Sequence, residues 1–310
     1  MTKKRLILYW VLAAVIALSY FCFCAEVFGQ WQSGVKPILG RQVKWAHPLS
    51  KGLVVLWPFN EGTGNKVFDL SGNGNHSNTF VGTAPTWTGG KYGSAVLFPG
   101  TDEYAEIPDS PSLRSTEITV SIVVNVSAFN AYCGIITKEE YSDKNSWRLY
   151  FGAAGNNVRF LIDKLGNLAT FGYSEAPINL NEWVHIVGTY DGTIIRLYIN
   201  GVLKDSDVFT DGMAQWDAPI RIATLGGVGH TEFLACIVSH ATIWNRALSA
   251  SEVNQLYREP FCMFEGDISV AQMYDYGEAP APSGQFITIQ MTAIPLFILF
   301  TAICFVKGRK

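Results

Sequence analysis

Apolar residues gather into one long run at each end of the chain and alternate with polar residues between those runs. Residues 6–24 follow the basic cluster Lys3-Lys4-Arg5, and residues 286–306 precede a second basic cluster at 307–310. A helix needs about 20 apolar residues to cross a bilayer core of roughly 30 Å, so the C-terminal run predicts a transmembrane helix. Basic flanks mark the cytoplasmic side of a membrane. The pattern therefore predicts that the long middle part of the chain lies outside the cytoplasm.

These runs and their flanks divide the chain into six predicted parts. Residues 1–29 are either a secretory signal peptide or an N-terminal membrane anchor, and both interpretations export the middle. The other parts are a connector at 30–45, a folded body at 46–264, an acidic, Pro-rich stalk at 265–285, the transmembrane helix at 286–306 and a basic cytoplasmic tail at 307–310. We expect a membrane location, with the main domain extracellular or periplasmic.

The body carries the period-two alternation of β-strands. In residues 182–203, Val184 and Ile186 occupy every second position of the first strand-like run. The dipeptides Asp191-Gly192 and Asn200-Gly201 interrupt the pattern. Both dipeptides favour the positive φ angles of tight hairpin turns, so this unit predicts a three-stranded meander. Further strand-like runs lie at 53–59, 94–98, 104–107, 118–126, 147–151 and 158–162.

Helical periodicity is confined to one short segment of the body. Ser249 and Glu252 have the spacing of a capping box, and Val253, Leu256 and Tyr257 supply an apolar face, which predicts a helix at about 250–257. Many short strands with a single helix indicate an all-β fold. We expect a two-sheet antiparallel jelly-roll sandwich, flanked in sequence by the N-terminal and C-terminal hydrophobic helices.

Charge and cysteine content exclude two classes of protein. Charged residues make up 16% of the chain and the net charge is −3, so no basic stripe can neutralise nucleic-acid phosphates. We expect no nucleic-acid partner. Only Cys133, Cys236 and Cys262 lie in the body, which is too few for a disulfide framework, although one disulfide among them stays open.

Several short motifs occur in a fixed order along the body. They are Trp57 to Gly64, Asp69 to Asn75, Lys91 to Ala95, Trp183 to Gly192, Tyr198 to Gly201 and Trp244 to Ser249. Together they resemble the laminin-G-like, or concanavalin A-like, jelly-roll family of bacterial and phage proteins over about residues 46–264. The resemblance implies a concanavalin A-like sandwich but does not fix a function.

The loop from Asp69 to Asn75 is the candidate metal site. Asp69, Asn73 and Asn75, with glycines between them, can turn oxygens toward a hard cation such as calcium. Members of the family often bind calcium near this loop and often carry an acidic pair in the last strand, where this chain has Ser239-His240. The resemblance therefore implies weak or absent calcium binding, and we expect no other cofactor. The competing interpretation is a turn in which Asp69 caps its own backbone.

The segment from Thr210 to Asp217 is the candidate ligand site. Trp216 offers a flat apolar face on which a sugar can stack, and Asp211 and Asp217 can accept hydrogen bonds from sugar hydroxyls. In the competing interpretation, Trp216 closes the end of the hydrophobic core.

Catalytic motifs are missing from the sequence. Related jelly-roll glycosidases use paired carboxylates on one strand, whereas Glu103 and Glu106 are three residues apart and so are expected on opposite faces. His185 and His240 lie within strand patterns and are expected to be structural. We expect a protein that is not an enzyme, with a glycoside hydrolase as a minor alternative.

The expected function is recognition or adhesion by a membrane-anchored, extracytoplasmic jelly-roll domain that binds a glycan or a surface protein. The alternative is a structural or assembly subunit of a surface or virion complex, as a homo- or hetero-oligomer, without a small ligand. Polar loops around an aromatic cleft would favour recognition, and a large apolar patch would favour assembly.

Overall fold

The computed structural model describes residues 36–37 and 41–264, apart from short gaps at 79, 84–85, 129–130, 141–143, 153–155, 165–166 and 227–231. The predicted signal peptide or anchor, stalk, transmembrane helix and tail lie outside the described residues and stay predictions. Within the described part, no helix combines the length and the apolar character that crossing a bilayer requires.

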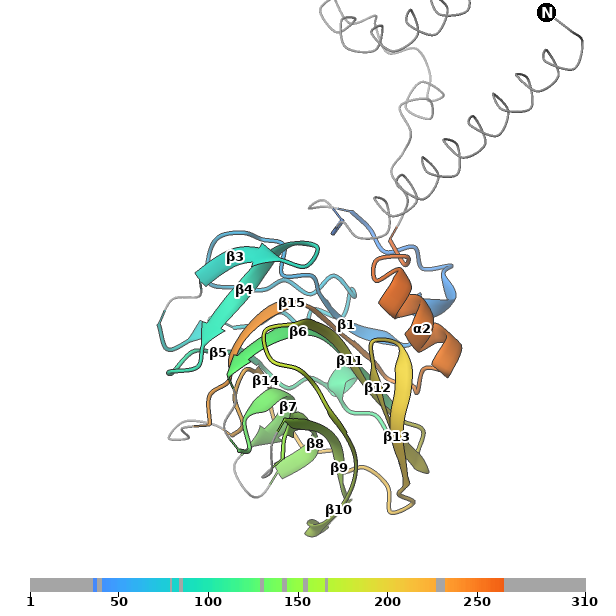
Figure 1. The fold of residues 1–310 in the computed structure, drawn as a ribbon. Helices are drawn as coiled ribbons and strands as arrows, with labels where there is room; N and C mark the ends of the chain where they lie inside the picture. The colour runs from blue at the N-terminus through green and yellow to red at the C-terminus, as the bar shows by residue number, and fades with distance from the viewer. Residues whose placement is uncertain are drawn as a thin grey trace, which may run out of the picture. The chain divides into compact units, whose positions relative to one another are not determined.

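Two antiparallel sheets face each other, which confirms the predicted sandwich (Figure 1). The first sheet has eight strands in the order β13-β12-β11-β6-β15-β4-β3, with β1 paired to β15 off this path. Their bounds are β13 (Val202–Val208), β12 (Ile194–Ile199), β11 (Trp183–Tyr190), β6 (Ile118–Ala128), β15 (Ala235–Trp244), β4 (Gly93–Pro99), β3 (Thr86–Gly90) and β1 (Leu53–Trp57).

The second sheet has seven strands in the order β10-β9-β8-β7-β14-β5-β2. Their bounds are β10 (Asn167–Pro177), β9 (Asn157–Lys164), β8 (Lys144–Phe151), β7 (Gly134–Glu140), β14 (Ile220–Ile222), β5 (Tyr104–Ile107) and β2 (Phe80–Val81). Two short 3-10 helices, η1 (Pro48–Ser50) and η2 (Pro111–Leu113), and the helix α2 (Ala250–Arg258) complete the described elements.

The main core fills the space between the two sheets. β11 turns Val184 and Ile186 inward, as the sequence predicts, and β9 supplies Phe160 from the opposite sheet. A Cβ atom at Gly188 would lie 2.2 Å from the Phe160 ring, so glycine is what allows the sheets to approach here.

The predicted meander is also confirmed at its turns. Gly192, Asn200 and Gly201 have φ angles of 87°, 51° and 77°, in the left-handed region that such turns need. β11 pairs with β12, and β12 pairs with β13, both antiparallel.

A second apolar cluster lies on the outer face of the eight-stranded sheet, beneath α2. It joins Val187 and Tyr198 of the sheet to Leu49 and to Val253 and Leu256 of the helix. α2 therefore lies outside the sandwich, next to β12 and β13 (Figure 1).

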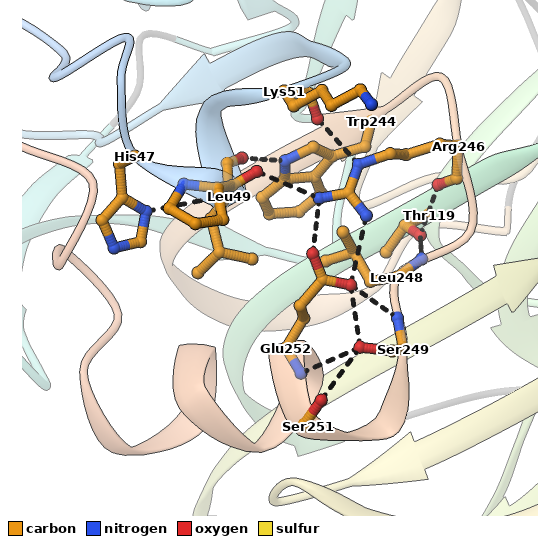
Figure 2. A network of polar contacts seen from close by, with 11 residues as sticks. His47, Leu49, Lys51, Thr119, Trp244, Arg246, Leu248, Ser249, Ser251 and Glu252 are labelled. Carbon is orange, nitrogen blue, oxygen red and sulfur yellow. Dashed lines mark hydrogen bonds and ion pairs between the residues drawn. The ribbon is translucent and has the colours of Figure 1, made fainter.

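Polar contacts at the end of β15 fix the position of this helix (Figure 2). The indole Nε1 of Trp244 donates to the Leu49 carbonyl at 2.6 Å. Arg246 donates to Glu252 at 2.7 Å and to the Lys51 carbonyl at 2.8 Å. Ser249 and Glu252 form the predicted capping box, and the helix covers the predicted residues.

The two ends of the described stretch 41–264 meet at one place. Val43 and Phe264 form an isolated antiparallel bridge, and the Lys44 amide donates to the Met263 carbonyl at 2.8 Å. Val43 is buried, so part of the predicted connector packs on the domain.

Candidate functional site

The predicted ligand loop, residues 210–217, is fastened to the ends of two strands of the seven-stranded sheet. Met213 forms an isolated bridge with Lys164, and the Ala214 amide donates to the Asp163 carbonyl at 3.0 Å, both at the end of β9. The Trp216 amide donates to Ser146 Oγ of β8 at 3.3 Å. The loop is thus a fixed part of one end of the sandwich.

The two predicted carboxylates of this loop each meet a lysine. Asp211 lies 3.4 Å from Lys164, and Asp217 lies 2.8 Å from Lys144. The hydrogen bond from Lys144 lowers the pKa of Asp217. Both pairs are exposed to solvent, where ion pairs contribute little to stability. The structure therefore places Asp211 and Asp217 at different strand ends, each already neutralised.

Trp216 takes a position between the two predicted alternatives. Its side chain is half-buried, and its indole Nε1 is buried without a hydrogen-bond partner within the described residues. Among the described residues, no hydrogen bond joins the Trp216 indole to Asp211 or Asp217. The three predicted residues thus share one loop, and their role in ligand binding stays a prediction.

An open cavity of about 580 Å³ lies beside this loop. Three segments that are far apart in sequence line it: the stretch before β6, the loop itself and the turn after β15. The lining residues are all polar, namely Arg114, Ser115, Thr116, Glu117, Gln215 and Asn245. Gln215 is held in place because its Nε2 donates to the Ser115 carbonyl and, at 3.2 Å, to the Met213 carbonyl.

A chain of charged groups orients Arg114 at this cavity. Arg114 Nε donates to Asp109 Oδ2 at 3.0 Å, and Lys138 Nζ donates to Asp109 Oδ1 at 2.5 Å. Lys138 also donates to the Ala218 carbonyl at 2.6 Å and is buried, and this burial lowers its pKa while Asp109 opposes the shift. The hydrogen bond to Asp109 raises the pKa of Arg114, whose guanidinium stays charged and partly exposed.

Sequence reasoning found Gln215's loop but missed the rest of the cavity. Arg114 to Glu117 carry no motif, and only the fold brings them to Gln215. Asn245 belongs to the Trp244 to Ser249 motif, which was the one available signal for this end of the sandwich.

The outer face of the seven-stranded sheet holds two buried carboxylates that resemble a catalytic pair only in composition. Arg148 contacts both, Asp163 at 3.0 Å and Glu139 at 3.7 Å. Burial raises the pKa of Asp163 to about 6, against the effect of Arg148. Glu106 of β5 is paired with Arg221 at 2.9 Å. These carboxylates are held in ion pairs, which suits a structural network.

The predicted metal loop is a hydrogen-bonded turn in this structure. Asp69 accepts from the amides of Leu56 (2.9 Å), Ser71 (2.8 Å) and Asn75 (3.0 Å) and from the Ser71 hydroxyl (2.7 Å). Both carboxylate oxygens are thus used by the protein, and a cation would have to displace these donors.

The two asparagines of the loop are also bonded to the protein. The Asn73 amide group donates to the Leu53 carbonyl at 3.2 Å, and that of Asn75 donates to the Val54 carbonyl at 2.8 Å. Among the described residues, no group of three or more His, Cys, Asp or Glu is arranged to hold a metal ion. Weak or absent calcium binding by this loop stays a prediction.

Comparison with known proteins gives a family and a set of structural neighbours. A family model described as the concanavalin A-like lectin/glucanases superfamily matches residues 99–254. No curated protein matches the sequence.

Three solved structures illustrate the shared fold. The binding domain of Paraclostridial Mosquitocidal Protein 1 has a TM-score of 0.56 at 18% identity, covering 67% of this chain and 52% of that one. The botulinum neurotoxin serotype D ligand binding domain, in complex with N-acetylneuraminic acid, has a TM-score of 0.53 at 17% identity, covering 67% and 51%. Domain 4 of AbnA, an extracellular arabinanase from Geobacillus stearothermophilus in complex with arabinotriose, has a TM-score of 0.53 at 18% identity, covering 66% and 98%.

The chain spans about half the length of the two toxin domains and nearly all of the arabinanase domain. At these identities the likeness shows the fold alone. The neighbours with this fold are mainly binding domains.

Proposed function

Because this chain belongs to the concanavalin A-like lectin/glucanases superfamily, we propose that it is a membrane-anchored, extracytoplasmic recognition domain that binds a glycan without catalysis. The observation that carries the proposal is the open cavity of about 580 Å³ at the end of the sandwich, which is lined by polar residues. The neighbours in complex with N-acetylneuraminic acid and arabinotriose support a glycan as the ligand class.

The cavity lining suits a polyhydroxylated ligand. Arg114 is a fork of donors, Glu117 is an acceptor, and the carboxamides of Gln215 and Asn245 can do both. Sugar hydroxyls also donate and accept, so neighbouring hydroxyls of one ring can be matched by neighbouring side chains. Since the lining carries no aromatic ring, we expect hydrogen bonds rather than stacking to supply the specificity.

The absence of catalysis is part of the proposal. The buried carboxylates Glu139 and Asp163 share Arg148, and a glycosidase needs one carboxyl group free to protonate the leaving group and a second to act as nucleophile or base. A glycoside hydrolase stays the minor alternative, and release of reducing ends from a bound glycan would establish it.

A glycan array tests the proposal directly. The full chain, kept in solution with a polyoxyethylene detergent that carries no sugar, is applied to the array, and the affinity of each hit is then measured. Arg114→Ala is expected to weaken binding about tenfold or more, because hydrogen bonds to charged groups are worth about 1.5–3 kcal/mol. Gln215→Ala is expected to weaken it about fivefold, because neutral hydrogen bonds are worth about 1 kcal/mol. Arg258→Ala and Gln255→Ala on α2 are the matched controls. Full affinity of both cavity variants would refute this site.

One observation favours the alternative of an assembly subunit. The edge strand β13 exposes Val202, Leu203 and Val208 to solvent. The same strand carries Lys204, Asp205 and Asp207 and a register shift against β12, features that discourage pairing with another strand. Light scattering of the full chain would separate the two functions, since an assembly subunit forms a defined oligomer in the absence of any glycan.

A further inference from the structure

β15 changes its partner along one edge. Its ladder with β4 ends at the pair Val238↔Val96, and its ladder with β1 begins at Ala241↔Trp57. On its other edge, the register with β6 shifts between Val238 and His240, which makes Ser239 a bulge. Ser239 thus stands outside the ladders of the described strands. Buried backbone groups at such a gap need hydrogen-bond partners from elsewhere.

Three backbone carbonyls from separate segments converge at this gap. The oxygens of Phe59, Ser94 and Ser239 all accept from Lys36 Nζ, at 3.1 Å for Phe59 and 2.6 Å for Ser239. Phe59 has a φ of 49°, in the left-handed region that residues other than glycine rarely adopt. The strained backbone at Phe59 and the bulge at Ser239 therefore turn two carbonyls toward the same point.

The three oxygens at this point suit a positively charged group. An ammonium group has three N–H donors, one for each carbonyl, whereas a neutral amine has only two. Lys36 is buried, which lowers its pKa to about 7, and the negative charge of Glu61 opposes that shift. One carboxylate oxygen of Glu61, Oε2, is buried without a hydrogen-bond partner in the described residues.

We propose that the carbonyls of Phe59, Ser94 and Ser239 form a cation-binding site that the chain fills with its own Lys36, and that the negative charge of Glu61 favours a cation there. Carbonyl and carboxylate oxygens are the ligands that hard inorganic cations such as calcium prefer. A free cation of this class takes the site when the ammonium group is removed. The Lys36 side chain also ties the predicted connector to β4 and β15, at a place distinct from the Asp69 loop.

Two substitutions at Lys36 distinguish the loss of the ammonium charge from the opening of room for a cation. Lys36→Ala removes the ammonium and leaves room for a cation, whereas Lys36→Met removes the ammonium but fills most of the room. The full chain is measured in detergent, at a pH below the pKa of Lys36, with chelator, calcium chloride or magnesium chloride. Lys51→Ala, at an exposed lysine, controls for the loss of one positive charge.

Calcium is expected to distinguish the two variants. Both should melt below the parent in chelator, and calcium should raise the melting temperature of Lys36→Ala alone, because a ligand that binds only the folded state stabilises it. Calorimetric titration should give Lys36→Ala at least about tenfold tighter calcium binding than the parent or Lys36→Met. An equal calcium response of the two variants, or parent-like stability of Lys36→Ala in chelator, overturns the proposal.

The proposal remains testable when Lys36→Ala does not fold in chelator. Calcium must then restore its folding, and failure to fold in every salt while Lys36→Met folds overturns the site. Glu61→Gln gives a second readout in a chain that keeps Lys36. It should lower the melting temperature below that of Asp102→Asn, a matched change at an exposed carboxylate. A Glu61→Gln chain as stable as this control also counts against the proposal.

Discussion

The hydrogen bonds that Asp69 accepts hold the conformation of the loop after β1. One carboxylate gathers three backbone amides and one hydroxyl, so the segment from Leu56 to Asn75 closes around it. The sequence predicted that this aspartate matters and offered two roles, a cation ligand or a cap of its own turn. Both roles need the same residue types at the same spacing, so only the positions of the donors could separate them. In the structure, the amides of Ser71 and Asn75 donate to Asp69, as expected for a carboxylate that caps its own turn.

Replacing Asp69 with alanine should therefore destabilise the fold whether or not calcium is present. The amides of Leu56, Ser71 and Asn75 would lose their acceptor, and each unsatisfied buried group costs about 1–3 kcal/mol. We expect a loss of at least about 3 kcal/mol in the free energy of unfolding, measured with urea, against no change for Asp207→Ala at an exposed site. A calcium-dependent rise in the parent's melting temperature that Asp69→Ala abolishes would instead support the metal role.

At the scale of single residues, the cavity proposed as the ligand site was the least predictable. Trp216 was chosen for its chemistry, yet its neighbour Gln215 lines the cavity. The other lining residues come from the ends of β6 and β15, and no local pattern tells which strand ends meet.

At the scale of elements, the meander of β11 to β13 and the helix α2 were predictable because their signals are local: alternation, two turn dipeptides and a capping box. β7 gave no such signal. Its Lys138 is buried and Glu139 follows it, and register shifts at two places break the alternation. Only the folded structure explains the charged residues of this strand, because it pairs Lys138 with Asp109 and Glu139 with Arg148.

The interface between the eight-stranded sheet and the segment formed by α2 and the residues after it contains two buried histidines in one cross-strand row. His185 of β11 and His240 of β15 both pair in register with Val123 of β6. His185 stacks on Tyr257 of α2 with ring centroids 6.1 Å apart, and each ring leaves its Nδ1 without a partner among the described residues. Their predicted structural role thus fits the burial.

This interface should weaken as the pH falls. Burial lowers the pKa of His185 to about 3 and that of His240 well below its ordinary value. The unfolded chain binds protons at these histidines near pH 6.5, while the folded chain does not. Their contribution to stability is therefore fully present above that pH and is lost progressively below it. As the pH falls, each histidine lowers the free energy of unfolding by up to about 1.4 kcal/mol per pH unit. Asp163 acts in the opposite direction, because its raised pKa lets the folded state bind a proton first.

Urea unfolding between neutral pH and pH 5 checks this expectation. His240→Phe removes one titrating group and places a ring beside Tyr92 and Phe261, which contact His240 in the parent. The variant should lose less stability than the parent over that range. His47→Asn, which keeps a side chain able to cap η1, is the control and should follow the parent. Identical pH profiles for His240→Phe and the parent would contradict the argument.

At the scale of the whole molecule, the class of fold was predictable and the strand order was not. β15 is the last of the described strands along the chain, yet it lies inside the eight-stranded sheet between β6 and the pair β4 and β1. Its position depends on contacts between residues far apart in sequence, which alternation along one segment does not encode. The ordered motifs supplied that information only through their resemblance to a family.

The membrane topology is a prediction of the same scale. From the two basic flanks we propose that residues 41–264 lie outside the cytoplasm and Lys307 to Lys310 inside it. Protease added to intact cells that express the chain should digest the domain and spare a fragment carrying the C-terminal tail. Lysed cells are the control, in which the tail should be lost as well. A domain that survives in intact cells and is cut only after lysis would reverse this topology.

The bridge between Val43 and Phe264 has a mechanical consequence. Residues 43–44 and 263–264 lie side by side, so once Lys36 is released, a pull that separates these two segments loads this bridge and the bond from Lys44 to Met263 before it reaches β1 and β15. The contacts would open one after another, like a zipper. A pull on a bound ligand against both flanks instead distributes the load over two chains in parallel. A domain held through both of these segments can thus bear tension while its sandwich remains folded.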